Sequence, residues 1–136
     1  MTSFIQLSMG VSRVYEKLKD IFNAVAIKNL TAVDIPKQSS QSKGSNQHEI
    51  GGLVKAGFAS YLGKPQNGEV SSLKATMVYI GHSEEELFIC EDRVSWYDTR
   101  YKSPNRGPEY RLYYRTNDVT ALLQEGDFFL IALTKQ

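Results

Sequence analysis

The residue types with the most evident binding chemistry gather in residues 96–114, where tryptophan, tyrosine and arginine are interleaved around a tip that contains proline and glycine. Arginine can donate two hydrogen bonds to one guanine, and glutamate can accept one from the amino group of cytosine. Arg106, Glu109 and Arg111 supply this set, and Glu109 and Arg111 would share one face of a regular strand. The stretch therefore predicts a DNA-reading arm. Its residues are equally compatible with a surface hairpin whose tyrosines cover the core while its charges pair with one another.

A second polar segment, residues 36–46, has no apolar side chain after Pro36 and continues into Gln47, His48 and Glu49. It offers amides, hydroxyls and two lysines, all of which can bind phosphates or base edges. A linker between two domains is the alternative, but the piece before it is too short to form a core. Because long loops inside a domain are more often functional than idle, we expect this loop to contact DNA as well.

Groups that could catalyse a reaction are sparse. His48 and His82 lie far apart in the chain, and the sequence has neither a phosphate-binding glycine loop nor Cys and His residues at metal-ligand spacing. The Glu-x-Lys or Asp-x-Lys element of metal-dependent nucleases is also absent. We therefore expect no enzymatic activity, no metal and no cofactor. A small metal-dependent nuclease or another hydrolase built from His48, Glu49 and Asp98 is the alternative.

Hydrophobic periodicity predicts the elements that must position these residues. We expect helices over residues 11–22 and 54–62 and a helical turn over 117–123. The expected strands cover residues 24–34, 47–53, 73–81, 86–90, 94–99, 110–115 and 126–134. About seven strands, mostly adjacent and antiparallel, favour a mainly β fold of the α+β class that forms a closed or nearly closed barrel.

The chain has 136 residues and a net charge of +1, which fits one soluble domain over residues 1–136. Residues 93–115 carry six basic and two acidic side chains, whereas residues 84–92 carry five acidic and none basic. This separation predicts a positive and a negative side, although a solvated surface of mixed charge is equally compatible with it. The single cysteine, Cys90, cannot form an internal disulfide, and no apolar run approaches the length of a membrane span. We expect a cytoplasmic protein that binds no membrane.

The order of these elements, together with the sequences of residues 26–32 (AIKNLTA), 47–53 (QHEIGGL) and 96–101 (WYDTRY), resembles the N-terminal DNA-binding domain of EcoRII-type restriction endonucleases. The resemblance implies a seven-stranded DNA-binding pseudobarrel with short flanking helices, a fold shared with the plant B-type transcription-factor domains. It also implies that two projecting arms grip the major groove of double-stranded DNA. The first arm would end at His48, and the second would carry Arg106, Glu109 and Arg111.

The resemblance extends to the partners. Domains of this family are specificity modules of restriction-modification systems and serve phage defence, joined to a nuclease or a nucleotide-driven motor elsewhere in the polypeptide or complex. We thus expect an N-terminal specificity domain of a larger restriction protein. The expected DNA contacts are Lys28, Lys37, Lys43, Ser45, Asn46, Gln47, His48, Arg100, Tyr101, Lys102, Asn105, Arg106, Glu109 and Arg111. A protein-interaction barrel whose arms bind another subunit is a further alternative.

Overall fold

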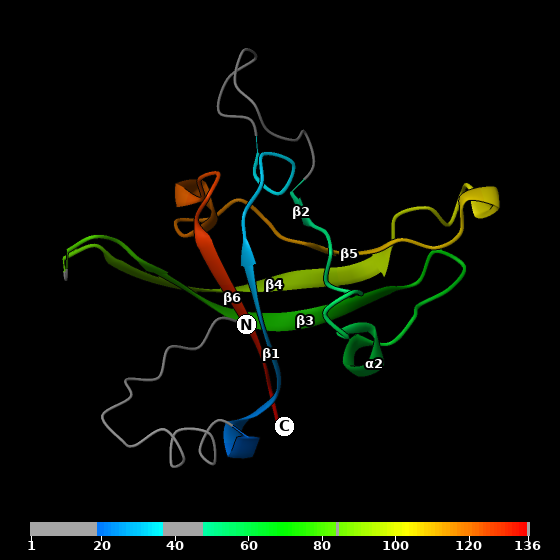
Figure 1. Cartoon of the computed structure of the whole chain (residues 1–136), viewed down its shortest axis with the longest axis horizontal. Helices are drawn as coiled ribbons and strands as arrows, with labels where there is room; N and C mark the ends of the chain where they lie inside the picture. Colours follow the sequence, from blue (N-terminus) through cyan, green and yellow to red (C-terminus); the bar gives the residue numbers. More distant parts are fainter. Residues whose placement is uncertain (1–18, 37–47, 84, 136) are drawn as a thin grey trace.

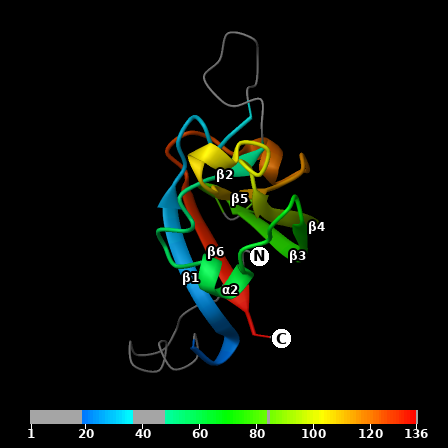
Figure 2. The same cartoon turned by 90° about the vertical axis from the view of Figure 1, so that its right-hand side faces the viewer.

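In the computed structural model, residues 19–36, 48–83 and 85–135 are described, and their strands form two antiparallel sheets. A two-stranded ribbon consists of β1 (Phe22–Asn29) and β6 (Phe128–Thr134). The larger sheet has the order β2-β5-β4-β3, with strands β2 (Glu49–Ile50), β5 (Tyr110–Tyr113), β4 (Leu87–Asp98) and β3 (Val70–Ile80). The ribbon crosses the larger sheet at a steep angle (Figure 1), and the two form separate layers in the turned view (Figure 2).

The core lies between these layers and centres on Trp96, which is fully buried. The Trp96 ring stacks on Tyr110, with 5.8 Å between ring centroids, and its indole Nε1 donates to the Gly63 carbonyl at 2.9 Å. That hydrogen bond ties the end of the short helix α2 (Ala59–Leu62) to the middle of the larger sheet. Since β4 and β5 both contribute to this core, it anchors the base of the arm that connects them.

The β3–β4 hairpin is longer than the sequence predicted. Strands over residues 86–90 and 94–99 were expected to be separate, but β4 runs without interruption and pairs with β3 from Ile80↔Leu87 to Val70↔Tyr97. The charged residues at the expected break occupy a paired strand, and Thr76 Oγ1 donates to Glu91 Oε1 at 2.8 Å across it. Backbone pairing thus continues through a locally polar stretch, so the prediction of two strands was wrong.

The other elements are shorter than predicted. The first strand ends at Asn29 because Thr31–Asp34 forms a turn in which the Asp34 N–H donates to the Thr31 carbonyl. Of the helix expected over 11–22, residues 19–21 are helical and Phe22 begins β1, while residues 11–18 lie outside the described part. The second helix is reduced to α2, the helical turn over 117–123 to the 3-10 helix η2 (Thr120–Leu122), and the strand over 47–53 to β2.

The described strands confirm a mainly β fold with few short helices, but their two sheets are not joined into a closed barrel. Within the same residues, no helix is both long and apolar enough to cross a membrane.

Candidate nucleic-acid interface

The arm predicted from the sequence extends from the end of β4 through residues 99–109 to β5, and its tip contains the 3-10 helix η1 (Pro104–Arg106). Figure 1 shows this tip projecting beyond the sheet. Asp98 holds its two sides together, because Asp98 Oδ1 accepts from the backbone N–H groups of Arg100 and Glu109, each at 2.9 Å. The Thr99 N–H also donates to the Glu109 carbonyl at 2.9 Å. The base of the arm is therefore closed by defined hydrogen bonds.

Glu109 lies between two arginines on one face of the arm. Arg100 Nε is 2.8 Å from Glu109 Oε2, and Arg111 Nη2 is 2.9 Å from Glu109 Oε1. This contact confirms that Glu109 and Arg111 share a face. The hydrogen bond from Arg111 lowers the pKa of Glu109 below its ordinary value, against a smaller rise caused by burial, so the carboxylate is ionised at neutral pH. All three side chains are about one-third exposed and open to solvent.

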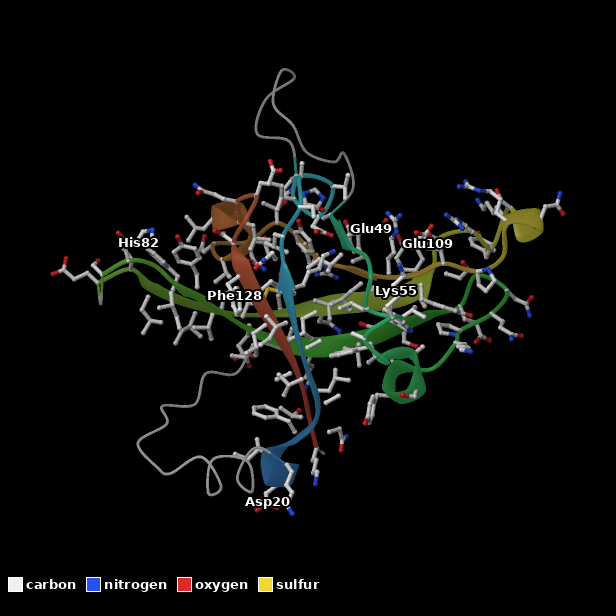
Figure 3. The ribbon with its side chains drawn as sticks, in the orientation of Figure 1. Asp20, Glu49, Lys55, His82, Glu109 and Phe128 are labelled. Atoms are coloured by element: carbon white, nitrogen blue, oxygen red, sulfur yellow. The ribbon has the colours of Figure 1, made fainter. Side chains whose placement is uncertain are left out.

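The network continues inward to Glu49 on β2, which is not among the expected DNA contacts. Glu49 is buried, its Oε2 lies 3.4 Å from Arg111 Nη1, and its Oε1 accepts from the Tyr97 hydroxyl. Burial and the hydrogen bond to Glu49 raise the pKa of Tyr97, which keeps the hydroxyl protonated as a donor. Its contact with Arg111 has no local signal in the sequence, because the pairing of β2 with β5 brings the two residues together. Figure 3 shows Glu49 and Glu109 near each other at the root of the arm.

The remaining predicted residues of the arm face solvent. Tyr101, Lys102, Asn105 and Arg106 are exposed. Lys102 Nζ lies 5.6 Å from the centroid of the Tyr101 ring, and the Arg106 carbonyl accepts a hydrogen bond from Arg100 Nη1 at 3.4 Å. Within the described ranges, Lys102 and Arg106 take part in no ion pair. Their positive charges are therefore available to an anionic partner.

Two other predicted residues are described: Lys28 on β1, and His48, which comes immediately before β2. Lys28 Nζ is 2.7 Å from the buried carboxylate of Asp34 and donates to the Gly51 carbonyl at 2.9 Å. These contacts link β1 to the turn at Asp34 and to the segment that follows β2. The His48 ring packs edge-on against Tyr114, with 5.6 Å between centroids, and its Nε2 is 3.1 Å from Thr116 Oγ1. The other predicted residues of the first arm lie outside the described residues: Lys37, Lys43, Ser45, Asn46 and Gln47.

The residues proposed for an alternative hydrolase site have separate structural partners. His48 is bonded to Thr116, Glu49 to Tyr97 and Arg111, and Asp98 to two backbone N–H groups. Across the part of the chain that the structure describes, no group of three or more His, Cys, Asp or Glu side chains could hold a metal ion.

A cavity of about 340 Å³ between the end of β3 and β6 is lined mainly by apolar side chains, among them Tyr79, Leu112 and Ile131.

Comparisons with models of protein families, with curated proteins and with solved structures find no match to this chain.

Proposed function

We propose that the chain recognises a specific sequence in double-stranded DNA and is the target-recognition domain of a restriction-modification system. The observation that carries the proposal is the ordered trio of Arg100, Glu109 and Arg111 on a projecting arm. A carboxylate has about four acceptor sites. Arg100 and Arg111 use two of those on Glu109, so the carboxylate can still accept from a cytosine amino group.

The exposed cations extend the same surface. Lys102 and Arg106 stand at the tip without an acidic partner among the described residues, where they can contact phosphates or the edge of a guanine. Tyr101 and Asn105 add hydrogen-bonding groups beside them. In the proposal, the tip of the second arm enters the major groove, and the first arm, the loop of residues 37–47 with His48, also contacts the duplex.

The proposal includes the architecture and partners that the family resemblance implies. The two sheets would belong to a seven-stranded DNA-binding pseudobarrel in a cytoplasmic restriction protein. A nuclease or nucleotide-dependent motor, in another domain or subunit, would act on the DNA after recognition.

Selection of bound duplexes from a random-sequence pool tests the proposal. The wild-type chain should enrich one sequence, and it should bind that duplex more tightly than a scrambled duplex of the same composition. If no sequence is enriched, the proposed function is wrong. Strand cleavage in the presence of magnesium would instead support the nuclease alternative, and binding that salt does not weaken would argue against phosphate contacts.

Single substitutions then test the base-reading residues. Arg106→Ala and Arg111→Ala should weaken binding to the enriched duplex roughly tenfold or more, with a smaller effect on the scrambled duplex. Lys37→Ala and Lys43→Ala should weaken both complexes to a similar extent. Arg106→Ala is easier to interpret than Arg111→Ala, because the Arg106 side chain forms no ion pair in the described structure that its removal would break. Equal losses on both duplexes from all four variants would rule out base reading by the arm.

A further inference from the structure

The buried carboxylate of Glu49 has both oxygens occupied by side chains from neighbouring strands. Glu49 stands on β2, the Tyr97 hydroxyl that donates to Oε1 stands on β4, and Arg111 beside Oε2 stands on β5. Only 5% of Glu49 is exposed, and the next residue, Ile50, belongs to the hydrophobic core. The three side chains therefore link the root of the arm to the core across adjacent strands.

Burying an ion pair such as Glu49 with Arg111 costs free energy. An ionised carboxylate loses its hydration on burial, and attraction to a single partner often does no more than offset that loss. In other proteins, replacing a buried ion pair by apolar side chains of similar volume is often neutral or stabilising. A gain in stability therefore does not explain why Glu49 is buried here. What Glu49 does affect directly is the orientation of Arg111.

Arg111 is constrained on three sides of its guanidinium group. Nη1 faces Glu49, Nη2 faces Glu109, and Nε is enclosed and has no hydrogen-bond partner among the described residues. Because the guanidinium is planar, these constraints define its plane, while the side chain keeps 33% of its surface exposed. Bidentate contact with a base requires such a defined plane.

We infer that Glu49 and Tyr97 are a positioning pair that orients Arg111 for base contact and thereby sets the sequence preference of the arm. The inference rests on the proposed function, which it deepens. Positioning should change the discrimination between sequences, because a misoriented guanidinium keeps its charge but loses the geometry of base contact.

The test measures affinity for the enriched duplex and for the scrambled duplex in Glu49→Gln, Tyr97→Phe and the control Glu91→Gln. Glu91 is an exposed glutamate of β4 bonded to Thr76, so the control makes the same chemical change away from the arm. Glu49→Gln should lower the ratio of the two affinities roughly tenfold, the size expected when a hydrogen bond to a charged group is lost. Tyr97→Phe should lower the ratio by less, and Glu91→Gln should leave it unchanged.

A double-mutant cycle separates positioning from a general structural role. If Glu49 acts through Arg111, the substitution Glu49→Gln should not change the affinity ratio further in an Arg111→Ala background. Additive losses, or an unchanged ratio in Glu49→Gln alone, would overturn the inference. Should Glu49→Gln fail to fold, as judged by Trp96 fluorescence, Tyr97→Phe decides the question. If the wild-type chain enriches no sequence at all, the proposed function itself is wrong. That outcome is distinct from a failure of Glu49→Gln or Tyr97→Phe to change the affinity ratio.

Discussion

At the scale of single residues, Asp34 shows how a charged group is built into the core. Its carboxylate accepts from Lys28 Nζ at 2.7 Å, from the Thr31 N–H and hydroxyl, each at 2.8 Å, and from the Gly51 N–H at 3.4 Å. Burial alone would raise the pKa of Asp34, but the hydrogen bonds from Lys28 and Thr31 outweigh burial and hold that pKa below its ordinary value of 3.8. Asp34 thus joins β1 to the segment that follows β2.

Asp34→Asn should reduce the free energy of unfolding by about 3 kcal/mol at neutral pH, because it leaves the Lys28 ammonium without its buried counter-ion. Urea titration followed by Trp96 fluorescence measures the loss. Glu91→Gln, which removes an exposed carboxylate, is the matched control and should cost less than about 1 kcal/mol.

The effect of Asp34 should depend on pH. Since its pKa is lower in the folded than in the unfolded chain, the stabilisation is fully present above the ordinary value of 3.8 and is lost as pH falls through the folded-state value. The difference in stability between wild type and Asp34→Asn should therefore shrink below about pH 4. A difference that stays constant down to pH 2 would contradict the role assigned to the ion pair.

At the scale of elements, the tip of the arm rests on the turn that precedes β3. Asn67 and Gly68 both have positive φ angles, 56° and 79°, and the Glu69 N–H donates to the Gln66 carbonyl at 3.0 Å. The Asn-Gly pair suits this backbone conformation. A Cβ added to Gly68 would lie 2.9 Å from Cε2 of Tyr101, so the ring of a predicted DNA contact packs directly on the turn. This contact couples the position of Tyr101 to a turn distant in sequence.

Gly68→Ala should therefore displace the Tyr101 ring and weaken binding to both the enriched and the scrambled duplex about threefold or more, as expected if a phosphate-contacting group moves. Gly57→Ala is the control: Gly57 also has a positive φ, 86°, but an added Cβ there meets nothing within 4 Å. Both variants should lose about 1 kcal/mol of stability through backbone strain, and only Gly68→Ala should lose DNA affinity. The same DNA affinity in both variants would mean that the turn does not support the arm.

At the scale of the whole molecule, the long β3–β4 hairpin separates charges of opposite sign. Glu85 and Glu86 lie at the turn between these strands, whereas the basic tip follows the other end of β4, about 40 Å away for 12 residues. In Figure 3, His82 marks the first end and Glu109 lies toward the second. A molecule with this polarity would approach a polyanion with its arm foremost.

The proposed complex should weaken steeply as salt increases, because each neutralised phosphate releases counter-ions. The double variant Lys102→Ala, Arg106→Ala should reduce the slope of log affinity against log salt by about two if both cations contact phosphate, and by about one if Arg106 contacts a base instead. Glu85→Gln with Glu86→Gln should leave the slope unchanged. A slope that the basic double variant does not alter would place the DNA elsewhere on the protein.

The sequence by itself determined features that depend on neighbouring residues. Alternation along strands indicated the mainly β fold, and the spacing of two residues placed Glu109 and Arg111 on one face, where their ion pair confirms it. Proline and glycine marked the tip of the arm. These features follow from the local geometry of an extended backbone, whose side chains alternate between two faces.

Only the tertiary structure decided which distant residues meet. Glu49 reaches Arg111 through the pairing of β2 with β5, Lys28 donates to the Gly51 carbonyl, and β4 continues through a polar stretch because β3 pairs with its backbone. Local periodicity holds no information on the register between separate segments, and the Glu49–Arg111 contact joins residues 62 positions apart. That register is selected by the burial of apolar faces and the pairing of polar groups across the whole chain. It determines which charges of the arm are paired within the fold and which remain exposed.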